Sequence, residues 1–160
     1  MPDNAPAPSL QERYAPRSIC FGCGPANAQG LRIRSFPEGD GLRTEWTPEP
    51  HHQAFEGAVN GGIIGSLFDC HCNWTAAWYL MNTTGADELP STVTAEFSVR
   101  FRRPTPSNRP LTLRSRVASA EGNRVTVEAT LESEGVLCAT GGGTFVAVAP
   151  DHPGYHRWGD

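Results

Sequence analysis

The sequence predicts an α+β fold in which one curved antiparallel sheet wraps around a single long helix. The segment from Ala58 to Met81 is the most apolar part of the chain, and its one formal charge is Asp69. A helix that is apolar on most sides has to be buried by other elements. Around this segment, several stretches alternate between apolar and polar residues with period two, which is the pattern of half-buried strands.

Two strands are expected before the helix. The segments 31–36 and 42–47 both show the alternation, and the run Glu38-Gly39-Asp40-Gly41 between them is rich in turn-forming residues. We therefore predict a hairpin that precedes the helix.

Four strands are expected after the helix, in the segments 92–101, 110–117, 124–132 and 136–148. The pairs Glu121-Gly122 and Glu134-Gly135 are typical of the turns of hairpins. The glycine run 141–143 would let a strand bend or let another backbone approach closely.

The length and the composition limit the possible functions. A chain of 160 residues suits one domain with a real core, and the sequence shows no internal repeat. The net charge of −4, from 13 Lys and Arg against 17 Asp and Glu, leaves no basic excess for binding nucleic acid. We expect residues 1–18 and 150–160 to be loosely held tails.

The same features favour the cytoplasm over export or membrane insertion. The first residues are proline-rich, polar and charged where a signal peptide needs an apolar core. Five cysteines are an odd number, which argues against a secreted disulfide framework. A membrane span is not expected either, because segment 58–81 would carry Asp69, His71, two asparagines and three glycines into lipid.

The start of the helix has an unusual composition. Asn60 is a strong N-cap candidate, and Gly61 and Gly62 would then be the first helical residues, although glycine is a poor helix former. Bare backbone at a helix start lets a ligand approach free N–H groups that carry partial positive charge. Tight packing of the helix start against the sheet would also explain the glycines, and the sequence leaves both explanations open.

Asp69 lies nine residues after Asn60, about two and a half turns into the helix. A carboxylate in an apolar environment has to be paired, solvated in a pocket or protonated. It could be a structural acid bonded to a neighbouring strand or subunit. We favour a general base or nucleophile that lines a cavity.

The sequence resembles a known family. The segments HHQAFEGAVNGGIIGSLFD (51–69) and TAEFSVRFRRPTP (94–106) are similar to those of the hotdog-fold acyl-CoA thioesterases. The segment CFGCGPANAQGL (20–31) resembles the N-terminal signature of a bacterial, phenylacetyl-CoA-thioesterase-like branch. The resemblance covers about residues 19–149, which we take as one hotdog domain. It implies hydrolysis of an acyl-CoA to the free acid and CoA, without a cofactor, in a homodimer or homotetramer whose sites lie between two subunits.

The resemblance also implies a role for each matching residue. Asp69 would be the catalytic base or nucleophile, the backbone N–H of Gly61 would donate to the thioester carbonyl oxygen, and Thr94 would help to hold the attacking water. His52 and Gln53 would line the acyl end of the pocket.

Two positions depart from the family pattern. Asn60-Gly61-Gly62 stands where most relatives have His-Gly-Gly, and Ala54 stands where some relatives have Asn. We expect Asn60 and Gly62 to contact substrate, since Asn can still donate a hydrogen bond although it cannot carry a proton as imidazole can. A non-catalytic acyl-CoA-binding protein is therefore an alternative.

A hotdog-fold dehydratase or hydratase is a second alternative. Such an enzyme usually needs an Asp–His pair, whereas His71 is two residues from Asp69 on the helix and points elsewhere.

The cysteines allow a zinc site, with Cys20 and Cys23 in a C-x-x-C spacing and Cys70 and Cys72 on the helix. Residues two apart on a helix point in different directions, so Cys70 and Cys72 should not bind one ion. We expect buried free thiols and no metal.

Arg100, Arg102 and Arg103 either reach the phosphates of coenzyme A or lie on an exposed strand face, and the second interpretation is favoured.

Overall fold

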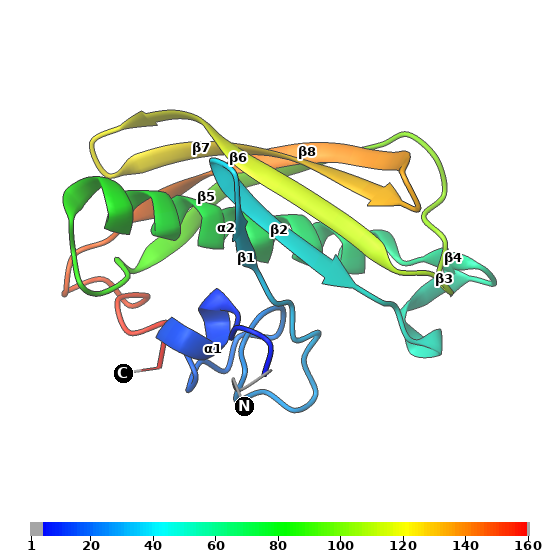
Figure 1. The fold of residues 1–160 in the computed structure, drawn as a ribbon, viewed down its shortest axis with the longest axis horizontal. Coiled ribbons are helices and arrows are strands. Elements are labelled where there is room, and N and C mark those ends of the chain that lie inside the picture. The colour runs from blue at the N-terminus through cyan, green and yellow to red at the C-terminus, as the bar shows by residue number, and fades with distance from the viewer. Residues whose placement is uncertain (1–4, 160) are drawn as a thin grey trace.

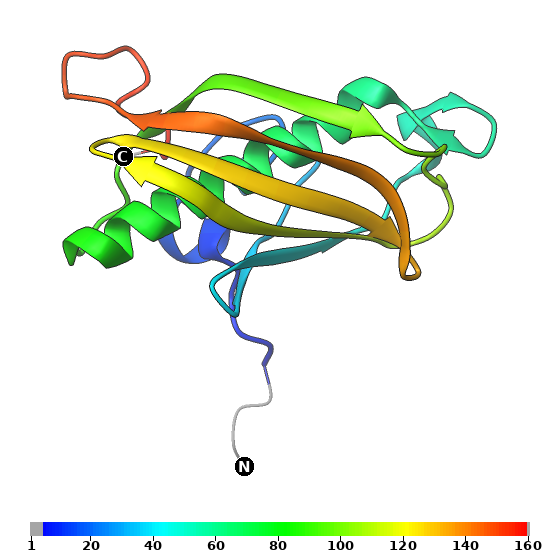
Figure 2. The ribbon, with the colours of Figure 1, turned by 90° about the horizontal axis from the view of Figure 1, so that it is seen from above.

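The computed structural model describes residues 5–159 and has the architecture that the sequence predicts (Figure 1). Six strands form one antiparallel sheet in the order β1-β2-β6-β7-β8-β5, and the strands β3 and β4 form a separate ribbon. The elements are α1 Leu10–Tyr14, β1 Phe36–Glu38, β2 Gly41–Trp46, the 3-10 turn η1 Pro50–His52, β3 Gln53–Phe55, β4 Ala58–Val59, α2 Gly61–Thr84, β5 Thr92–Phe101, β6 Leu111–Glu121, β7 Arg124–Ser133 and β8 Val136–Ala147. The curved sheet lies over α2 along the length of the helix (Figure 2).

Helix α2 begins and ends with local capping interactions. The Asn60 side-chain oxygen accepts hydrogen bonds from the N–H groups of Gly62 and Ile63, at 2.8 and 3.2 Å, and this confirms the predicted N-cap. At the other end, Gly85 takes a left-handed conformation with φ of 70°, which an L-residue rarely adopts. Between these caps the helix is buried from Ile64 to Met81 on most of its surface, so its nearly uniform apolar character reflects its central position.

The strands that follow the helix also match the prediction. The side chains of Val125, Val127 and Leu131 on β7 are at most 1% exposed and form the inner face of the sheet. The hairpin turns at 121–122 and 134–135 have residues with positive φ, as hairpin turns require. A Cβ on Gly142 would lie 2.0 Å from the carbonyl oxygen of Val127, so the glycine run does permit a close backbone approach.

The predicted strand 31–36 is wrong, because only its last residue belongs to β1. The N–H groups of Leu31 and Ile33 donate to the carbonyl oxygens of Phe21 and Gly22, at 2.8 and 3.0 Å, and not to a sheet partner. The alternation in this segment therefore comes from packing of an irregular loop beneath α2. The second predicted strand is correct to within one residue, since β2 runs from Gly41 to Trp46.

The terminal segments are not the loose tails that we expected, as far as the structure describes them. Ser9 caps α1, whose Leu10 is only 3% exposed, and the ring of Trp158 packs on Trp74 of α2 at 4.6 Å between centroids. Both segments lie against the side of α2 that the sheet leaves open (Figure 1), where apolar surface would otherwise face water. Residues 1–4 and 160, also part of the predicted tails, lie outside the described residues.

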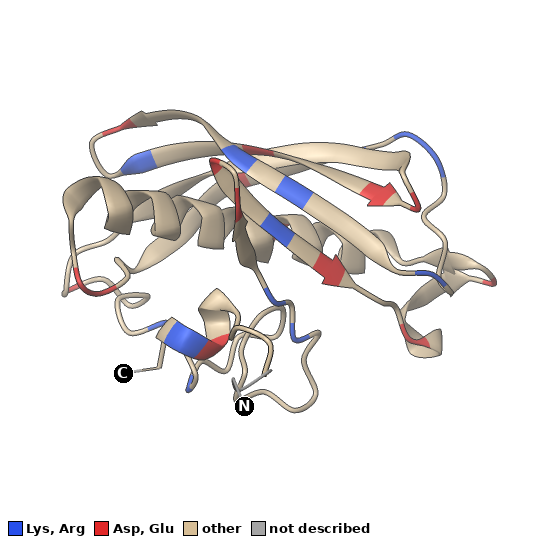
Figure 3. Ribbon diagram, viewed as in Figure 1, with Lys and Arg blue, Asp and Glu red and all other residues tan. Residues whose placement is uncertain are grey.

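Charged residues occupy the sheet, the loops and α1 (Figure 3), whereas Asp69 is the one charged residue of α2. Within residues 5–159, no helix combines the length and the apolar character that crossing a membrane would require.

Candidate active site

Asp69 and Thr94 form the centre of the candidate site. The Thr94 hydroxyl donates a hydrogen bond of 2.6 Å to Oδ1 of Asp69, and both side chains are half-buried. The pairing of β5 with β8 shifts register between Thr94 and Glu96, and such bulges re-aim side chains. The hydrogen bond orients the carboxylate, and the Asp69 side chain makes no other hydrogen bond among residues 5–159.

The surroundings of Asp69 make its carboxylate more basic. Burial raises the pKa of Asp69 above its usual value, while the Thr94 hydrogen bond and the positive charge of Arg157 oppose this increase. Arg157 comes from the C-terminal segment, and its guanidinium also donates to the carbonyl oxygen of Thr92 at 2.8 Å. Sequence analysis missed this residue because nothing in its local sequence indicates that the segment folds back to α2.

The start of α2 presents an unused donor. The cap occupies the N–H groups of Gly62 and Ile63, and the N–H of Gly61 has no protein acceptor within the described chain. A Cβ on Gly61 would meet only the Phe101 ring, at 3.6 Å, which is an ordinary contact. Packing therefore does not require glycine at position 61, and this favours the explanation that a ligand approaches the backbone there.

Gly61 also lies in the wall of a largely apolar pocket of about 440 Å³. The pocket is lined by Ala54, Phe55, Ala58, Val59, Gly61, Ile64, Phe101, Arg102, Arg103, Pro104 and Thr105. Arg102 and Arg103 thus line the same pocket as the helix start, whereas Arg100 does not.

His52 and Gln53 do not belong to this wall. The His52 ring is buried against Trp46, with centroids 5.0 Å apart, and the Gln53 side-chain oxygen accepts a hydrogen bond from the N–H of Gly57 at 2.8 Å. Both residues hold the loop that leads into α2. Their neighbours at 54–55 are the ones that face the pocket.

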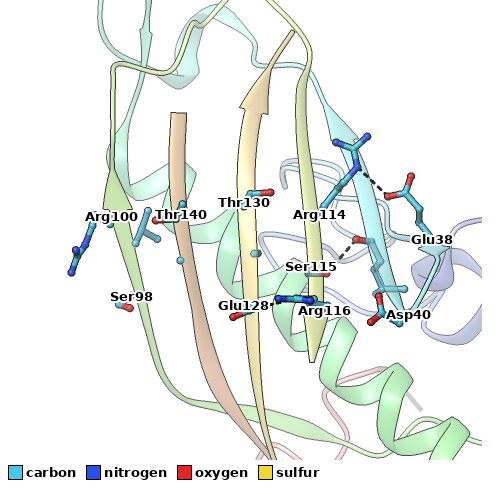
Figure 4. Close-up of a pocket in the computed structure, with 14 residues that line it drawn as sticks. Glu38, Asp40, Ser98, Arg100, Arg114, Ser115, Arg116, Glu128, Thr130 and Thr140 are labelled. Atoms are coloured by element: carbon cyan, nitrogen blue, oxygen red, sulfur yellow. Dashed lines mark hydrogen bonds and ion pairs between the residues drawn. The ribbon is translucent and has the colours of Figure 1, made fainter. Parts of the chain in front are cut away.

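A larger pocket of about 710 Å³ lies on the outer face of the sheet (Figure 4). Four of its charged groups form ion pairs, Arg114 with Glu38 at 3.1 Å and Arg116 with Glu128 at 2.6 Å. Exposed pairs of this kind contribute little energy. Asp69, Thr94 and Gly61 are not among its lining residues, so this surface is not the site that the sequence predicts.

His71 forms no pair with Asp69, as the sequence predicted. Its imidazole is fully buried, its Nδ1 accepts a hydrogen bond from the Ser35 hydroxyl at 2.8 Å, and its Nε2–H donates to the carbonyl oxygen of Leu42 at 3.2 Å. Burial lowers the pKa of His71 to about 4, so the ring is neutral at physiological pH. It is part of the structural core and cannot supply the second group of a hydratase.

Gly61 and Asp69 of one chain cannot act on the same bond. They are eight residues apart on one helix, which separates them by about 12 Å along its axis. A reacting carbonyl needs its donor and its attacking water within about 3 Å. The two groups of one chain therefore lie too far apart to meet at one carbonyl.

Three cysteines offer the clearest metal-ligating group among the described residues. The sulfur atoms of Cys20, Cys23 and Cys70 lie within 4.8 Å of one another, and Cys72 is not part of this group. The separation of Cys70 from Cys72 agrees with the sequence prediction. The proximity of Cys70 to the C-x-x-C loop was not predicted.

Comparisons with known proteins agree with this architecture. The sequence pattern of the Thioesterase superfamily matches residues 56–139. A search of curated proteins found no match. Among solved structures, a thioesterase superfamily protein from Shewanella loihica PV-4 is 30% identical with a TM-score of 0.63, over 78% of this chain and 98% of that one.

Two further structures are similar. A second thioesterase superfamily protein is 26% identical with a TM-score of 0.68, over 91% of this chain and 72% of that one. The E. coli PaaI protein, from the phenylacetic acid degradation operon, is 15% identical with a TM-score of 0.64, over 78% of this chain and 85% of that one. At that identity the likeness shows the shared fold alone.

Proposed function

Because this chain belongs to the thioesterase superfamily, we propose that it is an acyl-CoA thioesterase that hydrolyses its substrate to the free acid and CoA. The observation that carries the proposal is the pair of half-sites on α2. One is a half-buried carboxylate oriented by Thr94, and the other is the unused Gly61 N–H at the wall of an apolar pocket. Thioester hydrolysis needs an activated water and a donor aimed at the developing oxyanion, and these groups supply both.

The proposed reaction uses the acid of one subunit and the helix start of another. Asp69 takes a proton from water, whose oxygen attacks the thioester carbonyl, while the Thr94 hydroxyl keeps the carboxylate in position. The backbone N–H of Gly61 of the partner subunit donates to the oxyanion. Collapse of the tetrahedral intermediate breaks the carbon–sulfur bond, and the CoA thiolate leaves and takes up a proton. In the variant in which Asp69 is the nucleophile, its oxygen attacks the carbonyl directly, the carbon–sulfur bond breaks and the CoA thiolate leaves, and water then cleaves the resulting mixed anhydride.

The distance between the two half-sites supports a homodimer, and two dimers could pair into a tetramer. Strand β5 forms an edge of the sheet, and its Phe97 and Phe101 side chains are 45% and 54% exposed. Both rings lie beside the first turns of α2, near Gly65 and Gly61. A second copy placed against this apolar strip would cover it and bring the two kinds of half-site together.

The compartment that suits this proposal is the cytoplasm. All five cysteines are free thiols in the structure, which is the usual state in a reducing compartment.

The proposal is tested by a panel of acyl-CoA esters that varies in chain length and aromatic content. Hydrolysis is followed by the loss of thioester absorbance, because the partly exposed thiol of Cys20 would itself react with a thiol reagent. Turnover of at least one ester supports the proposal. Absence of turnover across the panel, combined with tight binding of acyl-CoA in calorimetry, would instead support the non-catalytic binding protein.

Arg102 and Arg103 are expected to bind the phosphates of coenzyme A. Both are exposed and line the pocket that contains Gly61. Replacing both with Ala should raise KM for acyl-CoA by about tenfold or more, since hydrogen bonds to charged groups contribute about 1.5–3 kcal/mol. The same acyl group on a short thiol without phosphates should be hydrolysed equally well by wild type and variant. Equal KM values of wild type and variant for acyl-CoA would show that these side chains face solvent and do not bind the phosphates.

Variants of Asn60 test whether the site is catalytically active. Asn60→Ala should lower the free energy of unfolding by about 1 kcal/mol, which is typical of losing a cap, and the two cap bonds of its side chain support this value. Activity that falls by much more than this loss explains would show that Asn60 also orients the thioester.

Asn60→His, which restores the residue common in the family, is the sharper test. It should keep or raise the hydrolysis rate. If the wild-type protein and Asn60→His both fail to hydrolyse acyl-CoA yet bind it, the chain is a non-catalytic binding protein.

A further inference from the structure

Two cysteines of one loop lie close to a cysteine of helix α2. Cys20 and Cys23 belong to the loop that follows α1, and Cys70 belongs to the helix. The sulfur atoms of Cys20 and Cys70 are 3.8 Å apart, and all three sulfurs lie within 4.8 Å of one another. Cys23 and Cys70 are 1% and 6% exposed, whereas Cys20 is partly open to solvent.

The distance between the sulfurs of Cys20 and Cys70 fits tetrahedral coordination. Zinc–sulfur bonds of about 2.3 Å at tetrahedral angles place neighbouring sulfurs about 3.8 Å apart. A disulfide would require sulfurs about 2.05 Å apart, so the cluster is an arrangement of separate thiols. A metal ion could enter between Cys20 and Cys70 without moving their sulfur atoms apart.

The glycine inside the C-x-x-C spacing is needed for this arrangement. A Cβ on Gly22 would lie 2.2 Å from the sulfur of Cys70, so any larger residue would push Cys70 away from the other two. The turn itself is closed by the N–H of Gly24, which donates to the carbonyl oxygen of Cys20 at 2.8 Å. The loop is thus shaped to admit the helix cysteine.

The cluster also accepts a hydrogen bond from helix α2. The indole N–H of Trp74 donates to the sulfur of Cys23 at 3.3 Å. Hydrogen bonds of this kind orient ligand atoms around metals. Trp74 is fully buried against Trp158, so its direction is held by packing.

The loop that carries Cys20 and Cys23 is long and irregular. Residues 15–35 form a stretch of 21 residues without a helix or a strand. Loops of this length inside a compact domain are uncommon and are usually functional. A bond from this loop to α2 would hold it in place beneath the helix that carries Asp69.

We propose that Cys20, Cys23 and Cys70 bind one zinc ion as thiolates, and that a water molecule occupies the fourth position on the open side of Cys20. Binding releases the proton of each thiol that coordinates the ion. This replaces the expectation of a metal-free protein, which rested on the separation of Cys70 from Cys72. That separation is real, but Cys72 is not needed.

The test is elemental analysis of protein purified under reducing conditions without chelator. We expect about one zinc per chain, and cobalt substitution should give thiolate-to-metal charge-transfer bands together with the intense visible bands of a tetrahedral site. Removing zinc with a chelator should lower the thermal midpoint by roughly 5 °C or more, because the ion binds only the folded chain. None of these measurements depends on thioester hydrolysis, so they stand apart from the proposed function.

Matched variants separate a site from adventitious binding. Cys70→Ser should lose stoichiometric zinc and the cobalt charge-transfer bands, whereas Cys72→Ser, two residues away and outside the cluster, should retain both. Zinc-free wild-type protein that takes up no zinc or cobalt would overturn the proposal, as would equal binding by the two variants. A mass showing an intramolecular disulfide in the reduced preparation would also overturn it.

Discussion

Replacing Asp69 with Asn is expected to lower kcat/KM for acyl-CoA hydrolysis by about 10²–10⁴-fold, the usual contribution of a general base. A nucleophilic role would give a loss at least as large. The amide cannot accept a proton from water, but its oxygen can still accept the Thr94 hydrogen bond that the carboxylate accepts at 2.6 Å. The variant therefore removes the chemistry with little change in shape.

The measurement is steady-state hydrolysis of the best ester of the panel, together with the thermal midpoint and the oligomeric state. Glu45→Gln is the matched control, since it converts an exposed acid on β2 to an amide away from α2 and should leave the rate unchanged. Hydrolysis by Asp69→Asn at the wild-type rate would show that another group activates the water.

Replacing Gly61 with Pro should lower kcat by about 10²–10³-fold, the usual cost of losing one oxyanion donor. Proline removes the N–H but suits the first position of a helix. The preceding residue, Asn60, already has φ of −58° and ψ of 136°, a conformation compatible with a following proline. Gly61→Ala is the control, since it keeps the N–H and its Cβ would contact Phe101 at an ordinary 3.6 Å.

Mixing the two inactive variants tests whether the site spans two subunits. In a heterodimer of Asp69→Asn and Gly61→Pro chains, one site receives the intact Asp69 and the intact Gly61, and the other site receives neither. Random exchange of subunits makes half of the dimers mixed, so about a quarter of wild-type activity should return. If no activity returns although mass spectrometry shows heterodimers, the acid and the donor do not act together across the interface.

Much of the fold was predictable because its signals are local. Asn60 and the glycines after it mark a helix start by capping rules alone, and alternation along 124–132 identifies β7 without knowledge of its neighbours. The ribbon of β3 and β4 was missed since strands of three and two residues are too short to show a period. The segment 31–36 was misassigned because burial beneath a helix and pairing in a sheet produce the same alternation.

The chemistry of the site was predictable only in part. An isolated carboxylate in an apolar helix stands out in the sequence, and the structure shows Thr94 as its partner. The influence of Arg157 on Asp69 was hidden, because the two residues are far apart in sequence. His52 and Gln53 were expected in the pocket. The His52 ring instead accepts a hydrogen bond from the N–H of Glu49, the Gln53 side chain bonds to Pro50 and Gly57, and residues 54–55 line the wall.

The sequence by itself determined the central helix, its capped glycine start and the position of its one acid, because helix caps, apolar runs and turn residues act over a few neighbours. Only the tertiary structure decided that both terminal segments pack under α2, that Cys70 joins Cys20 and Cys23, and that Arg157 comes close to Asp69. Each of these depends on where the chain returns to after a long separation. Such contacts arise from the burial of apolar surface over the whole domain, so they cannot be predicted from a short stretch of sequence.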